Sequence, residues 1–144
     1  MRIAIIEDEY FIADDLATEI RRSGHETIGP FAELSPAFHA ASSAAIGAAL
    51  LDVDLHGRAS FEFADLLLKR SIPFLIYTGY SREVIPGRFA PYVAEKPIQL
   101  AMWLIDCVAM CLCTARYGTG TSSVIAQTSA GRVGCSNATA RLAS

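Results

Sequence analysis

Ala-Ala-Leu-Leu at positions 48–51, followed at once by Asp52, is the stretch that decides the fold of this chain. Similar short apolar runs occur at 3–6, 74–77 and 92–94. Short apolar runs separated by helical patterns are typical of parallel strands, because helices bury both faces of such a sheet. The sequence therefore predicts an α/β protein with a parallel sheet and helices on both faces.

The pattern of apolar and polar residues predicts a regular alternation of strands and helices. Residues 25–28 are expected to form a short edge strand that ends at the Gly-Pro pair 29–30. The Pro-Gly pair 86–87 should keep any helix within 79–90 short. The predicted strands are 2–6, 25–28, 47–52, 73–77 and 91–94, and the predicted helices are 9–22, 34–44, 60–70 and 98–113.

Polar residues follow each of the four apolar runs, at or just beyond the point where a strand should end. In an open α/β sheet the carboxyl ends of the strands meet at one crevice, where ligands bind. Three carboxylates, one hydroxyl and one ammonium group should therefore come together, which suits a divalent cation and a phosphoryl group. These residues are Glu7, Asp8, Asp52, Thr78 and Lys96.

In order and approximate spacing, these residues resemble the receiver domain of bacterial two-component response regulators. The resemblance implies a flavodoxin-like, doubly wound five-stranded parallel sheet with helices on both faces. Each motif alone is a weak signal, and the joint order carries the resemblance. It covers about residues 1–114 and includes Thr78-Gly79-Tyr80, which is similar to stand-alone, single-domain receivers. The matching motifs are Glu7-Asp8, Asp52, Thr78 and Lys96-Pro97.

The resemblance implies a role for each of these residues. Asp52 would be the nucleophile that takes a phosphoryl group from a histidine kinase or a histidine phosphotransfer protein. Thr78 and Lys96 would contact oxygens of that phosphoryl group. The cofactor would be Mg²⁺ or Mn²⁺, which prefers oxygen ligands. The implied metal ligands are Glu7 (mainly through water), Asp8, Asp52 and the main-chain carbonyl of Asp54.

The favoured function is a phosphoacceptor receiver that signals by binding a partner or acts as a phosphate sink. Such a protein is not an enzyme beyond its own phosphorylation and slow dephosphorylation. One alternative is a pseudo-receiver adaptor that binds its partner without phosphorylation, against which the intact acidic set argues. Another is a small metal-dependent phosphohydrolase with Asp52 as nucleophile and Asp54 as general acid, although the sequence shows no cap domain.

Two features depart from the usual receiver pattern. Many receivers carry an aromatic residue three positions before the lysine, and Val93 fills that position here, with Tyr92 one step earlier. The usual aromatic switch is therefore not carried over to this chain. The loop after Asp52 reads Leu55-His56-Gly57, where many receivers have a proline, and His56 is expected in a loop close to the site.

Composition and charge fit one receiver domain, residues 1–116, followed by a tail, residues 117–144, that is rich in Gly, Ser and Thr and expected to be disordered. Residues 1–116 carry 10 basic and 15 acidic side chains, a net charge of −5. No basic patch is available to neutralise phosphates, which argues against nucleic-acid binding.

The expected location is the cytoplasm, because the apolar stretch 3–6 is too short for a secretory signal. Cys111 and Cys113 lack the histidine or second cysteine pair of a zinc site. The predicted helix 98–113 is apolar nearly all round, which predicts a homodimer or a downstream protein on this helix. It is not expected to span a membrane, because about 16 residues fall short of the roughly 20 that a bilayer requires.

Overall fold

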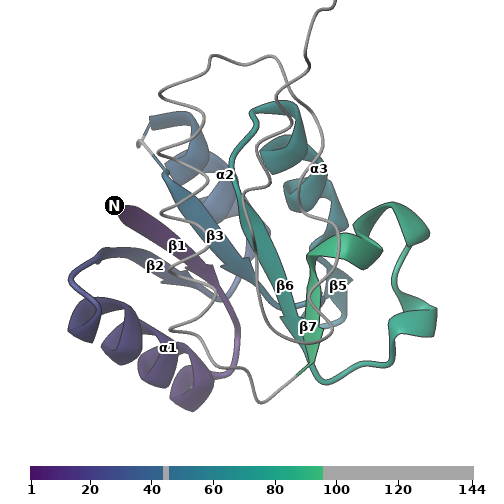
Figure 1. Cartoon of the computed structure of the whole chain (residues 1–144), viewed down its shortest axis with the longest axis horizontal. Helices are drawn as coiled ribbons and strands as arrows, with labels where there is room; N and C mark the ends of the chain where they lie inside the picture. The colour runs from purple at the N-terminus through teal and green to yellow at the C-terminus, as the bar shows by residue number, and fades with distance from the viewer. Residues whose placement is uncertain (44–45, 96–144) are drawn as a thin grey trace, which may run out of the picture.

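The sheet has the predicted parallel architecture. The structure, a computed structural model, describes residues 1–43 and 46–95. Within these residues five parallel strands form one sheet in the order β2-β1-β3-β6-β7, which is the order of a flavodoxin-like doubly wound fold (Figure 1). The strands are β1 (Arg2–Ile6), β2 (Glu26–Phe31), β3 (Ala48–Leu51), β6 (Phe74–Thr78) and β7 (Val93–Glu95).

Helices cover both faces of the sheet, as predicted. Helix α1 (Tyr10–Arg22) packs on one face, and α2 (Leu34–Ser43) and α3 (Phe61–Lys69) pack on the other (Figure 1). Successive residues of a strand point to opposite faces, so Ile5 packs with α1 whereas Ile6 packs with α2 and α3. Both faces of β1 and β3 are buried for this reason, and their apolar runs show no polar alternation.

The prediction for the second strand was wrong at its end. The strand continues through Gly29 and Pro30 to Phe31 instead of stopping at residue 28. A proline is tolerated because β2 lies at the edge of the sheet, where only one neighbour needs its hydrogen bonds. Gly29 has φ 93°, and the register with β1 shifts by one residue between Ala4 and Ile6, as in a β-bulge.

The segment between β6 and β7 contains two short 3₁₀ helices, η1 (Arg82–Val84) and η2 (Gly87–Tyr92), in place of a long helix. This agrees with the shortening predicted from the Pro-Gly pair 86–87. The strand predicted at 91–94 begins later, at Val93, because residues 91–92 belong to η2. Pro91 lacks an N–H group, and its fixed φ suits a helical turn better than the sheet ladder.

A small hairpin follows β3 and was not predicted. It consists of β4 (Asp54–Leu55) and β5 (Arg58–Ala59), which pair in antiparallel orientation. Strands of two residues carry no detectable hydrophobic period, so the sequence pattern could not reveal them.

Several predicted features lie outside the described residues: Lys96, the helix 98–113 with its proposed partner face, and the tail 117–144. Within the described ranges, no helix has the length and apolar character needed to cross a bilayer.

The structure predicts that the aromatic side chain of Phe63 contributes strongly to the stability of the fold. Phe63 on α3 is fully buried and packs edge-to-face against Phe38 on α2, with ring centroids 5.2 Å apart. Replacing it by alanine should lower the free energy of unfolding by about 3–5 kcal/mol, because the lost contacts leave a cavity. Phe11→Ala is the matched control: that ring is 76% exposed, and its loss should cost no more than about 0.5 kcal/mol. Urea unfolding followed by circular dichroism measures both, and equal losses would contradict the assignment of the core.

Candidate functional site

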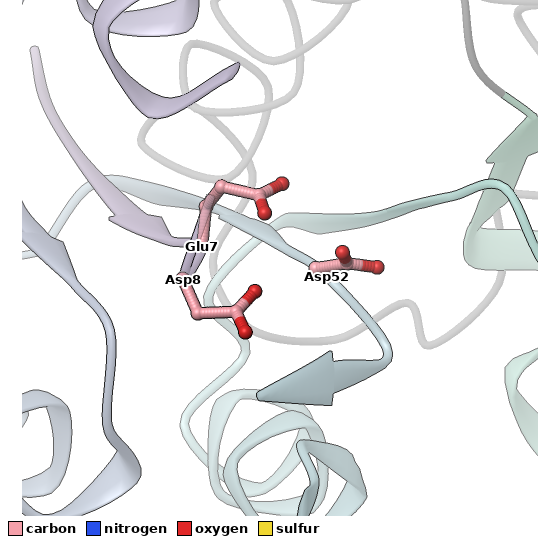
Figure 2. Close-up of side chains that lie close together, drawn as sticks. All are labelled: Glu7, Asp8 and Asp52. Atoms are coloured by element: carbon pink, nitrogen blue, oxygen red, sulfur yellow. The ribbon is translucent and has the colours of Figure 1, made fainter. Parts of the chain in front are cut away.

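Three carboxylates meet at the carboxyl ends of two adjacent strands. Glu7 and Asp8 follow β1, and Asp52 follows β3, which is the parallel neighbour of β1. The Asp52 N–H donates to the Ile6 carbonyl at 2.8 Å and so continues the ladder beyond the strands. One oxygen from each carboxylate lies within 4.8 Å of the others, and Figure 2 shows Glu7 and Asp8 extending from the end of β1 toward Asp52.

Glu7 is buried, with 3% of its surface exposed. Its N–H donates to the Phe31 carbonyl at 3.0 Å, which extends the β1–β2 ladder in the same way. Its Oε1 accepts a hydrogen bond from the Glu9 N–H at 3.1 Å, just before α1 begins. A carboxylate next to the first turn of a helix is stabilised by the N–H groups that the helix leaves unpaired.

Asp52 is half-buried and is held at two points. Its Oδ1 accepts a hydrogen bond from the Val53 N–H at 2.7 Å. Its main-chain carbonyl accepts a hydrogen bond from the hydroxyl of Ser60, which is fully buried. Sequence reasoning missed Ser60, because a serine just before a helix is typical of an N-cap and gives no sign of a distant partner.

Asp8 contacts a residue 48 positions away in the chain. The His56 N–H donates to Asp8 Oδ2 at 3.1 Å, and the ring nitrogen Nδ1 of His56 lies 3.1 Å from the same oxygen. The Asp8 side chain is 22% exposed, whereas the His56 side chain is 65% exposed. His56 was expected in a loop near the site, but its contact with Asp8 was not predicted.

Asp54 lies in β4, opposite Ala59 in β5. One pair further along, the Ser60 N–H donates to the Val53 carbonyl at 2.9 Å. Hydrogen-bonded and non-hydrogen-bonded pairs alternate along an antiparallel ladder, so the main-chain groups of Asp54 face away from β5. This orientation is compatible with the use of the Asp54 carbonyl as a ligand.

Thr78 is the last residue of β6 and is fully buried. Its Oγ1 accepts a hydrogen bond from the Tyr80 N–H at 3.1 Å, so its hydroxyl proton can still be donated to another group. Thr78 pairs with Glu95 at the end of β7, and Lys96 follows Glu95 in the sequence. Lys96 itself lies outside the described residues.

The donor set fits a hard divalent cation. Carboxylate oxygens are the ligands that Mg²⁺ prefers, and one or two of them together with water are typical of Mg²⁺ sites in proteins. Three carboxylates this close together also repel one another, and a bound cation would relieve that repulsion. The arrangement can therefore hold a cation beside the carboxylate oxygens of Asp52.

No protein-family model matches the sequence, and no curated protein matches it significantly. Solved structures do match this chain. The solution structure of SdrG from Sphingomonas melonis Fr1 is 31% identical over 78% of this chain and 96% of its own, with a TM-score of 0.66. The BeF3-activated conformation of SdrG from Pseudomonas melonis Fr1 is 32% identical over 79% of this chain and 94% of its own, with a TM-score of 0.59. The receiver domain of the PhyR response regulator from Erythrobacter litoralis is 24% identical over 85% of this chain and 95% of its own, with a TM-score of 0.65.

Proposed function

Because the chain belongs to the receiver domain family of response regulators, we propose that it takes up a phosphoryl group on Asp52 from a histidine kinase or a histidine phosphotransfer protein. The observation that carries this proposal is the cluster of Glu7, Asp8 and Asp52 at the ends of β1 and β3. The phosphorylated chain then signals by binding a downstream protein or serves as a phosphate sink.

In this proposal Asp52 is the nucleophile. A carboxylate oxygen of Asp52 forms a bond to the phosphorus of a phosphohistidine, and the P–N bond to the imidazole breaks. The electron pair of that bond stays on the imidazole nitrogen, which then takes a proton from water. The hydrogen bonds from the Val53 N–H to Oδ1 and from the Ser60 hydroxyl to the main-chain carbonyl keep Asp52 in place during the attack.

The cation site of this proposal consists of Asp8, Asp52 and the carbonyl of Asp54, with Glu7 acting through water. Bound Mg²⁺ or Mn²⁺ would supply positive charge to neutralise the transferring phosphoryl oxygens. The hydroxyl of Thr78 donates to a phosphoryl oxygen, and Lys96 adds a positive charge. The solved BeF3-activated conformation of SdrG supports the proposal, because BeF3⁻ becomes tetrahedral when a carboxylate oxygen bonds to it and then has the shape of a phosphorylated carboxylate.

The first prediction concerns the acceptor. Asp52→Asn should abolish labelling by the phosphodonor acetyl phosphate in the presence of Mg²⁺, because an amide is a far weaker nucleophile than a carboxylate. Asp54→Asn is the matched control and should still be labelled, since the proposal uses only its main-chain carbonyl. Labelling is measured as the mass increase of the intact protein and by its sensitivity to hydroxylamine.

The stoichiometry of that experiment separates the functions that the sequence left open. A receiver takes up one phosphoryl group per chain, so labelling should saturate at one. Full labelling of Asp52→Asn would show that the acceptor is wrong. Rapid, continuous release of phosphate, well above the slow dephosphorylation of a receiver, would favour a phosphohydrolase. The absence of labelling in the parent protein would favour a pseudo-receiver.

The second prediction concerns the cation. Asp8→Ala should weaken Mg²⁺ binding on the order of tenfold or more, because a unit charge at 4 Å contributes roughly 1–4 kcal/mol in a partly solvated site. Asp15→Ala removes an exposed carboxylate from α1 and should leave the affinity unchanged. Isothermal titration calorimetry with MgCl₂ measures both variants. Unchanged affinity in Asp8→Ala would refute the proposed ligand set.

A further inference from the structure

We propose that His56 is a positioning residue for the cation site: it holds the Asp8 carboxylate beside Asp52. The inference deepens the proposed function and rests on it. Two groups of His56, the main-chain N–H and the ring nitrogen Nδ1, each lie 3.1 Å from the same oxygen, Asp8 Oδ2.

The hairpin turn directs the His56 N–H toward Asp8. His56 and Gly57 connect β4 to β5 and both have positive φ, 53° and 84°. Two successive left-handed residues form the type I′ turn that suits a two-residue hairpin. Histidine adopts this conformation less readily than glycine but, with asparagine and aspartate, more often than other residues.

The base of the hairpin is fixed to the body of the protein. Leu55 is buried in the core with 3% of its surface exposed. The Ser60 N–H donates to the Val53 carbonyl at 2.9 Å and closes the loop. Because the turn is held at its base, the position of the His56 N–H is set by the fold and does not depend on the presence of a cation.

This fixed donor opposes the repulsion within the acidic cluster. One oxygen of Asp8 lies within 4.8 Å of oxygens of both Glu7 and Asp52. Asp8 is partly exposed, so repulsion alone would turn it outward toward water. Two contacts on Oδ2 restrain the position of that oxygen, as outer partners commonly do for metal-ligating carboxylates.

The same affinity measurement tests the opposite role for the His56 ring, competition with the cation. If the His56 ring competed with the cation for Asp8, then removing the ring would strengthen cation binding. The positioning role predicts the reverse, so the direction of the change in Mg²⁺ affinity decides between them.

Two substitutions separate the contribution of the His56 ring from that of the main-chain N–H in the turn. His56→Gly keeps a residue suited to positive φ, and hence the main-chain N–H, but removes the ring. His56→Asn also suits positive φ and keeps a donor nitrogen at the branch position that Nδ1 occupies in histidine. We expect His56→Gly to weaken Mg²⁺ binding by about three- to tenfold. This loss is smaller than the one caused by removing a buried partner of a metal ligand, because the His56 ring is exposed. His56→Asn should bind within about twofold of the parent, which would be rescue by the conservative variant.

The experiment is a calorimetric titration of the full chain with MgCl₂, together with the thermal unfolding midpoint of each variant. A parent-like affinity in His56→Gly, or a tighter one, overturns the positioning role. So does an equal loss in His56→Gly and His56→Asn, which would assign the effect to the turn. If Asp8→Ala weakens binding while His56→Gly does not, the proposed function stands and only this inference fails. If the parent protein does not bind Mg²⁺, both fail.

Discussion

The hydrogen bond from the Asp52 N–H to the Ile6 carbonyl, 2.8 Å long, is the contact on which the site depends. It lies one step beyond the last paired residues of β1 and β3 and continues their parallel ladder. The Glu7 N–H makes the equivalent bond to Phe31 on the other side of β1. Glu7 and Asp52 are thus held by the sheet itself, and they cannot separate without breaking ladder hydrogen bonds.

Bringing three carboxylates within 4.8 Å of one another is unfavourable, and the fold offsets this cost with hydrogen-bond donors. Each carboxylate accepts at least one main-chain N–H: Glu7 from Glu9, Asp8 from His56 and Asp52 from Val53. Hydrogen bonds to a charged group contribute about 1.5–3 kcal/mol each. The main-chain donors therefore hold the three carboxylates together without a cation, and a bound cation would further stabilise this arrangement.

The residues at the ends of the strands could be predicted because the signal is local. A short apolar run that ends in a polar residue is visible in the sequence, and parallel pairing then places such residues at one edge. The partners of these residues could not be predicted in the same way. The contact of His56 with Asp8 and that of Ser60 with Asp52 both depend on a hairpin whose strands have two residues each. The extension of β2 through Pro30 could not be predicted even though an edge strand was expected, because a Gly-Pro pair is usually the signal of a turn.

The segment between β6 and β7 has its own means of stabilisation. Arg88 makes a bidentate ion pair with Asp65 on α3, with distances of 3.2 and 3.0 Å. Tyr92 stacks on Phe74 with ring centroids 4.7 Å apart. Aromatic contacts of this kind contribute about 0.5–1.5 kcal/mol beyond the area they bury. The segment is therefore held against the core by a ring stack and an ion pair, although its helices are short.

Val93 occupies the position where many receivers carry an aromatic switch, and its side chain is buried. No ring can rotate at that position in this chain. The site also contacts the start of the segment, where the Thr78 hydroxyl accepts a hydrogen bond from the Tyr80 N–H at 3.1 Å. The hydroxyl assigned to the phosphoryl group in the proposed function is the same one that holds the first turn of the segment. A change in the position of that hydroxyl would therefore alter the hydrogen bond that holds Tyr80.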